Sequence, residues 1–187
     1  MKIHKLSLEG LLLIEPDVYK DDRGYFIELF HEQKFTDSGL PFQFSQDNLS
    51  FSNKNVIRGL HFQQSPFVQG KLVRVLKGAV RDVVVDIRKE SPTFGRHEII
   101  QLDESNNHVL WIPPDFAHGF SVLQDGTLFL YKCTFPYNKN AEFGIRFDDE
   151  ELNINWGIVN PVVSDKDRTL MSFAEYKKMI ALNKATV

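Results

Sequence analysis

The chain has 187 residues, of which 42% are hydrophobic and 25% charged, and its formal net charge at pH 7 is −3. This length and balance exclude a disordered or fibrous protein and predict a single domain, residues 1–187, with a sizeable hydrophobic core. Both signs of charge are scattered along the chain and Cys133 is its only cysteine, so we expect no nucleic-acid partner, no intrachain disulfide and a reducing compartment.

The N-terminal segment carries only a short apolar run, residues 11–14, after the charged Glu9. This run is too short for the apolar region of a signal peptide and far too short to cross a bilayer. We therefore expect a cytoplasmic protein that does not bind a membrane. Residues 32–38 then predict about two turns of helix, ended by Gly39.

Between residues 42 and 147 the sequence is a succession of short apolar or alternating runs separated by turns. Val83, Val84 and Val85 are β-branched on both parities, which predicts a strand covered on both faces. Asp125-Gly126 lies between two runs and predicts a tight hairpin turn. Regular short strands of this kind predict an all-β sandwich or barrel. The runs are 71–76, 79–88, 98–102, 108–112, 120–123 and 127–135.

The C-terminal part of the chain carries helix signals. Ser164, with Asp167 three residues later, predicts the N-cap of a short helical turn. Ser172 and Glu175 have the spacing of a capping box, and an apolar stripe of helical period begins at Phe173. We expect a C-terminal helix over about 173–183 at the periphery of the β domain.

The first candidate for chemistry is His61, within the run 56–63. On a regular strand, Ile57, Gly59, His61 and Gln63 share one face, and Gly59 leaves that face open for a ligand. A packed, hydrogen-bonded strand histidine is the commoner situation, by roughly three to one.

Further candidates lie on the later runs. His118 follows Pro113-Pro114 at the start of a run, where it could meet His61 across a barrel interior; the alternative is a solvated loop histidine. Tyr131 shares the parity of Phe129 and Cys133, although a strand tyrosine is usually a packing residue. Lys71 opens its run and by default is a charge at a strand end.

Two kinds of chemistry compete for these histidines. Metal-binding barrels of the cupin type supply two histidines separated by one residue. Here the residue two positions after His61 is Gln63, so that pair is missing, and the remaining histidines are not spaced as metal ligands. The other chemistry is proton transfer, with a histidine base, a tyrosine acid, a lysine beside a developing oxyanion and an aspartate that orients the histidine. Residue types alone do not bring these groups together. The remaining histidines are His4, His31, His97 and His108.

Over nearly its whole length, the chain resembles the dTDP-4-dehydrorhamnose 3,5-epimerase family. Several matching stretches in the same order are far more specific than any single motif. They are residues 22–26 with Glu28, 46–48, 58–63, 69–75, 91–95, 112–114 with 117–120, 130–132 and 164–167.

The resemblance implies a cupin-like jelly roll that forms a homodimer and a reaction that needs no metal or organic cofactor. It implies the substrate dTDP-4-dehydro-6-deoxy-D-glucose, whose C4 ketone acidifies the hydrogens at C3 and C5. His61 would remove the C3 proton with Asp167 as its partner, Lys71 would stabilise the enolate, and Tyr131 would deliver a proton from the opposite face.

The resemblance also implies a set of substrate-binding residues. Arg23 and Glu28, on the N-terminal segment, would reach the nucleotide across a dimer interface. Three alternatives stay open: a 3-epimerase that inverts one centre, a metal-dependent cupin oxygenase, and a non-catalytic protein that binds sugar nucleotides. The implied residues around the diphosphate and sugar are Arg58, His118, Gln46, Asn48, Glu142 and Lys166, with Tyr137 lining the sugar.

Overall fold

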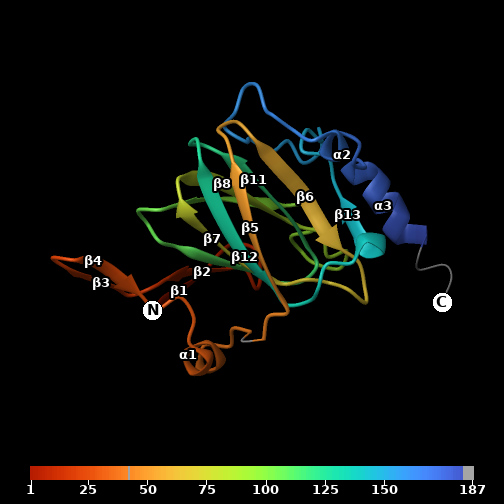
Figure 1. The fold of residues 1–187 in the computed structure, drawn as a ribbon. Coiled ribbons are helices and arrows are strands. Elements are labelled where there is room, and N and C mark those ends of the chain that lie inside the picture. The colour runs from red at the N-terminus through yellow and green to blue at the C-terminus, as the bar shows by residue number, and fades with distance from the viewer. Residues whose placement is uncertain (42, 183–187) are drawn as a thin grey trace.

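The computed structural model describes residues 1–41 and 43–182, and two antiparallel β-sheets packed face to face dominate it (Figure 1). Strands β5 to β8 alternate between the sheets along the chain, as do β9 to β13, which is a jelly-roll arrangement. The all-β sandwich predicted from the sequence is confirmed. The six-stranded sheet is β1 (Lys2–Lys5), β2 (Leu12–Glu15), β10 (Val109–Ile112), β7 (Lys71–Lys77), β12 (Thr127–Cys133) and β5 (Gln46–Ser52). The five-stranded sheet is β13 (Glu142–Gly144), β6 (Ile57–Gln63), β11 (Phe116–Val122), β8 (Ala79–Asp86) and β9 (His97–Asp103).

The remaining elements lie around this sandwich. A two-stranded ribbon, β3 (Val18–Asp21) and β4 (Gly24–Ile27), projects away from the body in Figure 1. The short helices predicted near both ends are confirmed, and among the described residues no helix is long and apolar enough to cross a membrane. Residue 42, where we expected the core strands to begin, and residue 183, at the end of the predicted helix, lie outside the described residues. The helices are α1 (Glu32–Asp37), the 3₁₀ turn η1 (Lys139–Ala141), α2 (Asp165–Arg168) and α3 (Phe173–Leu182).

The core has two main layers, one on each face of the five-stranded sheet. Val84 of β8 faces the other sheet and packs in the inner layer, whereas Val83 and Val85 face outward into a second layer. All three are fully buried, so the predicted strand covered on both faces is confirmed. The chain after β13 covers the outer layer with Trp156 and Tyr176, whose polar atoms donate to backbone carbonyls at 2.7 and 2.9 Å.

The C-terminal helix signals act as predicted. Ser172 and Glu175 bond to each other reciprocally at the start of α3, which is a capping box. Ser164 Oγ accepts from the backbone N–H of Asp167 at 3.1 Å and thereby caps α2. Both helices lie along one side of the sandwich (Figure 1), where Phe173 and Tyr176 of α3 pack into the outer layer of the core.

The turn at Asp125-Gly126 does not form the predicted hairpin. It connects β11 to β12, but β11 pairs with β6 and β8, whereas β12 pairs with β5 and β7 in the other sheet. The turn therefore carries the chain from one sheet to the other. Turn residues look alike in both situations, because strand partners are set by the whole topology.

Strand β6 contains a bulge opposite β11, which changes the faces that its residues present. His118 pairs with His61 and Phe120 pairs with Arg58, so β6 has one extra residue in this stretch. The predicted shared face is therefore wrong at Ile57, which packs in the outer layer, while Arg58 and His61 both line the interior cavity.

Gly59 is required for a different reason from the one predicted. Its φ angle is +123°, and a Cβ atom there would lie 2.5 Å from Gly119 Cα and 2.8 Å from His118 O. The glycine permits close approach of the β11 backbone rather than opening a face to ligand.

Candidate active site

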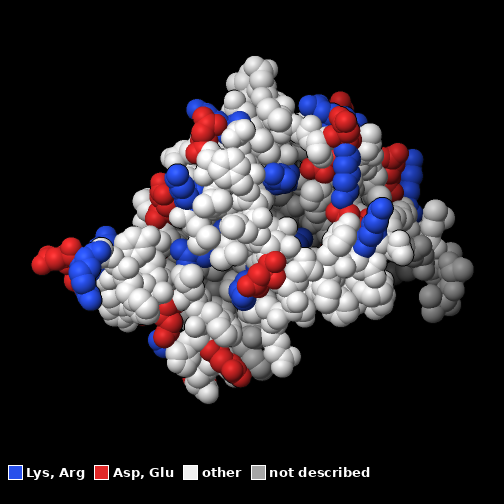
Figure 2. Space-filling model, in the orientation of Figure 1, with Lys and Arg blue, Asp and Glu red and all other residues white. Residues whose placement is uncertain are grey.

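A cavity of about 490 Å³ opens between the two sheets and contains most of the predicted site residues. Figure 2 shows that this face of the molecule is hollowed near its centre and that basic side chains lie in and around the hollow. Of the predicted residues, only Arg23 and Glu28 do not line the cavity. The lining includes Gln46, Asn48, Ser50, Arg58, His61, Gln63, Gln69, Lys71, His118, Phe120, Phe129, Tyr131, Cys133, Tyr137, Glu142, Ser164, Lys166 and Asp167.

His61 of β6 and Asp167 of α2 form an ion-pair-like contact on one wall of this cavity. His61 Nε2 lies 2.8 Å from Asp167 Oδ1, and the backbone N–H of Gly59 donates to Asp167 Oδ2 at 3.2 Å. Burial raises the pKa of Asp167, but its bonds to His61, Gly59 and Ser164 outweigh burial and leave the pKa below the ordinary value. The carboxylate is therefore charged and can accept a hydrogen bond from Nε2–H, which leaves Nδ1 free to act as a base.

Lys71 and Tyr131 enter the cavity from the opposite sheet. Lys71 is 8% exposed, and its Nζ donates to the backbone oxygen of His61 at 3.3 Å. Burial lowers the pKa of Lys71 and raises the pKa of Tyr131. Since Tyr131 stays protonated at neutral pH, it can act as a proton donor facing a base on the other sheet.

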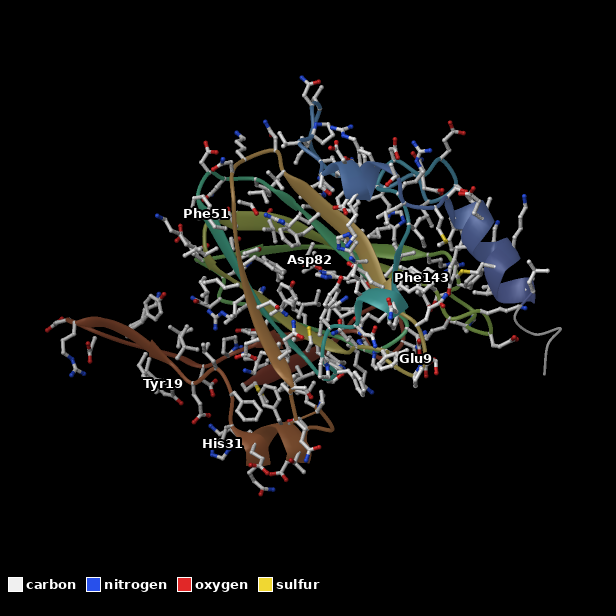
Figure 3. The ribbon with its side chains drawn as sticks, turned by 45° about the vertical axis from the view of Figure 1, so that its right-hand side comes forward. Glu9, Tyr19, His31, Phe51, Asp82 and Phe143 are labelled. Carbon is white, nitrogen blue, oxygen red and sulfur yellow. The ribbon has the colours of Figure 1, made fainter. Side chains whose placement is uncertain are left out.

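His118 forms a second histidine–aspartate pair deeper in the sandwich. Its Nε2 lies 3.0 and 2.9 Å from the two carboxylate oxygens of Asp82 on β8. Its ring is nearly parallel to that of Phe129, with 6.2 Å between the ring centroids. Figure 3 shows Asp82 in the middle of the molecule, between the sheets. The alternative of a solvated His118 is wrong, because the residue is 7% exposed. Sequence reasoning missed Asp82, although a charged residue within the apolar run 79–88 was a detectable signal.

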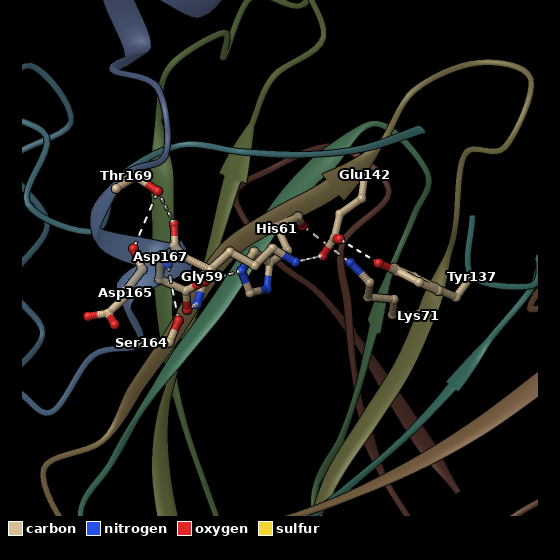
Figure 4. A network of polar contacts seen from close by, with 10 residues as sticks. Gly59, His61, Lys71, Tyr137, Glu142, Ser164, Asp165, Asp167 and Thr169 are labelled. Atoms are coloured by element: carbon tan, nitrogen blue, oxygen red, sulfur yellow. Dashed lines mark hydrogen bonds and ion pairs between the residues drawn. The ribbon is translucent and has the colours of Figure 1, made fainter. Parts of the chain in front are cut away.

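A third polar group closes the mouth of the cavity. Tyr137 Oη donates to Glu142 Oε2 at 2.7 Å, and Lys166 Nζ donates to Glu142 Oε1 at 2.6 Å. Burial raises the pKa of Glu142, but its bonds to Lys166 and Tyr137 lower the pKa overall. In Figure 4, His61 lies between Asp167 on one side and Glu142 with Tyr137 on the other.

Strand β5 presents a row of polar side chains to the cavity. Gln46 Nε2 donates to Asn48 Oδ1 at 2.9 Å, and Asn48 Nδ2 lies 3.7 Å from Cys133 Sγ. Arg58 is held by Ser52, whose Oγ accepts from Nε at 3.1 Å. The row of β5 and Arg58 of β6 therefore bring amide groups and one guanidinium to the wall beside Tyr131.

Arg23 and Glu28 lie outside the cavity of their own chain. Arg23 sits on the β3–β4 ribbon and bonds to Asp21, while Glu28 follows β4 and bonds to Lys34 at 2.6 Å. The ribbon, marked by Tyr19 in Figure 3, points away from the sandwich.

The arrangement of donors differs from that of a three-ligand metal site. The Nε2 atoms of His61 and His118 each contact a separate aspartate. At the position where metal-binding cupins place a second histidine, the amide of Gln63 is bonded to the backbone of two loops. Within residues 1–41 and 43–182 no three histidine, cysteine, aspartate or glutamate side chains are grouped so as to hold a metal ion.

Comparison with known proteins identifies the family that has this fold and cavity. The family model described as dTDP-4-dehydrorhamnose 3,5-epimerase matches residues 5–175. The chain belongs to the dTDP-4-dehydrorhamnose 3,5-epimerase family. A relative of that name from Shigella flexneri is 46% identical over 176 residues, which are 94% of this chain and 97% of the relative.

Solved structures of epimerases share the whole fold. The 3,5-epimerase of Legionella pneumophila Philadelphia 1, in complex with dTDP-4-keto-L-rhamnose, is 43% identical with a TM-score of 0.88, covering 94% of this chain and 96% of that one. A 3'-monoepimerase of Streptomyces bikiniensis, in complex with dTDP-quinovose, is 32% identical with a TM-score of 0.89, covering 94% and 90%. The cupin-like fold and the isomerase class expected for this epimerase family member are therefore confirmed.

Proposed function

We propose that this epimerase inverts C3 and C5 of dTDP-4-dehydro-6-deoxy-D-glucose and yields dTDP-4-dehydro-L-rhamnose. The observation that carries the proposal is the placement of His61 and Tyr131 on opposite sheets, facing one cavity that also holds Lys71. Inversion through a planar enolate needs a base on one face of the sugar and an acid on the other. The family relationship supplies the substrate class.

His61 and Lys71 act in the first half of the reaction. The C4 ketone acidifies the neighbouring C–H bond, and His61 Nδ1 takes the C3 proton while the electron pair moves to the C4 oxygen. Asp167, 2.8 Å from Nε2, stabilises the imidazolium that forms. Lys71 stabilises the negative oxygen, and the low polarity of its buried position strengthens this interaction.

Tyr131 completes the inversion. Its hydroxyl protonates C3 from the face opposite His61, and the electron pair returns from the enolate oxygen to carbon. After proton exchange restores the two groups, the same steps invert C5. Burial supports this role because a raised pKa keeps the phenol protonated until the enolate forms. The reaction uses the chain's own side chains and no cofactor.

The rest of the cavity binds the substrate in this proposal. Arg58 and His118 lie near the diphosphate and sugar, Gln46 and Asn48 contact polar substrate groups, and Tyr137 lines the sugar. Lys166 and Glu142 complete the wall at the mouth, where their contact of 2.6 Å keeps both side chains ordered.

We also propose a homodimer in which the ribbon completes the neighbouring site. Tyr25 and Phe26 on the ribbon are 61% and 66% exposed, and the outer face of β5 exposes Leu49 and Phe51. Arg74 on the same sheet has buried Nε and Nη1 atoms without a partner among the described residues. Exposed apolar side chains and two buried guanidinium nitrogens without a partner support a surface that a second copy covers, since both are unfavourable in a monomer. Arg23 and Glu28 then reach the partner's nucleotide.

Proton exchange in deuterated water tests the proposed function. The substrate dTDP-4-dehydro-6-deoxy-D-glucose is incubated with the protein, and NMR follows deuterium at each carbon. Deuterium at C3 and C5 with inversion of both supports the 3,5-epimerase, and exchange at neither carbon contradicts it. His61→Ala should lower the rate by roughly three to six orders of magnitude if His61 is the base.

A single inversion at C3 is the second candidate. The chain is similar to a 3'-monoepimerase over 94% of its length, and this supports the second candidate. Inversion at C3 is common to both reactions. Exchange confined to C3 in the same experiment selects this reaction.

A further inference from the structure

Loop 135–138, at the mouth of the cavity, takes its backbone hydrogen bonds from glutamine side chains. A segment of this kind has no strand partner, so its polar groups need other partners. Three glutamines from three separate segments supply them. The bonds are Gln69 Nε2 to Phe135 O at 2.7 Å, Gln63 Nε2 to Pro136 O at 3.3 Å, Tyr137 N to Gln46 Oε1 at 2.7 Å and Asn138 N to Gln63 Oε1 at 2.7 Å.

Gln63 is the central member of this group. It is the last residue of β6, two residues after His61, and is 5% exposed. Besides its two bonds to loop 135–138, its Nε2 donates to the backbone oxygen of Phe67 at 2.6 Å. Both polar ends of the buried amide are therefore in use, and one side chain joins the loop before β7 to the loop after β12.

The loop held by Gln63 carries a wall of the cavity. Tyr137 extends from it and donates to Glu142, which in turn binds Lys166 next to Asp167. Glu142 is also the direct cross-strand partner of Gln63 in the β13–β6 pair. Gln63 thus contacts the chain on both sides of the turn η1, and at the end of β6 it links the strand of His61 to the mouth of the cavity.

We propose that Gln63 is a positioning residue for the epimerisation, acting through loop 135–138 to hold Tyr137 against the substrate. This inference rests on the proposed function. The hydroxyl and ring of Tyr137 are otherwise on an exposed loop, 51% exposed, where their position would vary. Rates fall steeply when a group beside the reacting centre is displaced by about 1 Å, by on the order of a hundredfold.

The neighbouring residue provides a matched control. Gln64 is partly buried on the other side of β6, where its Nε2 contacts Met179 Sδ of α3 at 3.5 Å. Gln64 does not line the cavity, and the hydrogen bond of its amide goes to α3 rather than to loop 135–138. Replacement of Gln63 or Gln64 by leucine removes the same amide, so a difference between the variants reports position rather than residue type.

The experiment measures deuterium exchange at C3 and C5, kcat, KM and the melting temperature for Gln63→Leu, Gln64→Leu, Tyr137→Ala and the double variant Gln63→Leu/Tyr137→Ala. We expect Gln63→Leu to lower kcat by roughly tenfold or more with an unchanged pH profile, and Gln64→Leu to stay within about twofold of wild type. In the Tyr137→Ala background, Gln63→Leu should change kcat by less than about twofold, because it has nothing left to position.

Two results overturn the inference. One is that Gln63→Leu lowers kcat no more than Gln64→Leu does; the other is that Gln63→Leu lowers kcat as much in the Tyr137→Ala background as in the wild type. If Gln63→Leu does not fold, Gln63→Glu carries the same comparisons, since it keeps the acceptor and loses the two donated bonds. Wild-type protein that exchanges neither C3 nor C5 refutes the epimerase function and the inference together. If the wild type exchanges deuterium but Gln63→Leu has no more effect on kcat than Gln64→Leu, the inference alone is refuted.

Discussion

At the scale of single residues, the candidate active site keeps its reactive atoms free of strong protein partners. Among the described residues, Lys71 Nζ donates to one backbone oxygen, at 3.3 Å, although burial disfavours the charge of the ammonium group. His61 uses Nε2 for Asp167, which leaves Nδ1 for the proposed proton transfer. A buried cation without a bound carboxylate is costly in the free protein, and an enolate oxygen would relieve that cost.

Tyr131→Phe separates the two halves of the reaction. The enolate should still form, because His61 and Lys71 are intact, but the acid on the opposite face is lost. We expect inversion to slow by about 10²–10⁴-fold while deuterium still enters C3 with retained configuration. NMR of the product in deuterated water distinguishes the outcomes, and inversion at the wild-type rate would remove Tyr131 from its role.

Gly59→Ala tests the close approach of two backbones beside His61. The new Cβ would lie 2.5 Å from Gly119 Cα at a φ angle of +123°, so we expect a loss of about 2–4 kcal/mol in the free energy of unfolding. Gly24→Ala is the control, because its φ angle is +126° and no atom lies within 4 Å of the added Cβ. Urea denaturation of both variants checks this, and equal losses would show that only the backbone angle matters.

At the scale of elements, loops are ordered by side chains where strands end. Asp86, the last residue of β8, accepts from the backbone and guanidinium of Arg88 at 2.8–3.0 Å and from the hydroxyls of Ser91 and Thr93. Burial raises the pKa of Asp86, but these hydrogen bonds outweigh burial and lower the pKa to about 2. One carboxylate therefore shapes the loop between β8 and β9.

The lowered pKa of Asp86 predicts a pH-dependent effect of Asp86→Asn. A carboxyl whose pKa is depressed on folding stabilises the protein above its unfolded pKa of about 3.9, and this contribution disappears as pH falls through about 2. We expect Asp86→Asn to lose about 2 kcal/mol at pH 7 and progressively less below pH 4. Urea denaturation at several pH values measures the difference, with the exposed Asp22→Asn as control. A loss independent of pH would mean that shape, not charge, is responsible.

At the scale of the whole molecule, the sandwich covers its two sheets unequally. The chain after β13 covers the outer face of the five-stranded sheet, whereas Leu49, Phe51 and Leu76 are exposed on the six-stranded sheet. Burial lowers the pKa of Arg74 on that sheet, and a carboxylate from a second copy would compensate. The ribbon supplies a further exposed apolar surface.

Mixing two inactive variants tests the proposed exchange of ribbons in a dimer. Arg23→Ala should impair the partner's cavity, and His61→Ala should inactivate its own. A mixed dimer then contains one intact site, built from the His61 of one copy and the Arg23 of the other. After subunit exchange of equal amounts we expect about a quarter of the wild-type rate. No recovery beyond the sum of the separate variants would place Arg23 at its own chain's site or at none.

Features that depend on local periodicity could be predicted from the sequence, and features that depend on strand register could not. The buried strand at Val84, the caps at Ser164 and Ser172, and the strand face that Tyr131 shares with Phe129 and Cys133 follow from spacing alone. The bulge that turns Arg58 and His61 to the same side depends on pairing with β11, far along the chain. The partner of His118 and the hydrogen bonds of Gln63 depend equally on which distant segments come together.

The placement of His61 and Tyr131 on different sheets has a consequence for variation far from the cavity. Stacked sheets lie about 10 Å apart, and the side chains between them set that spacing. Val73, Val84 and Leu110 fill this space. The thickness of the hydrophobic core therefore determines the distance between Tyr131, the proposed acid, and His61, the proposed base. Conservative substitutions such as valine to alanine in this layer would change the geometry of proton transfer without touching a polar atom.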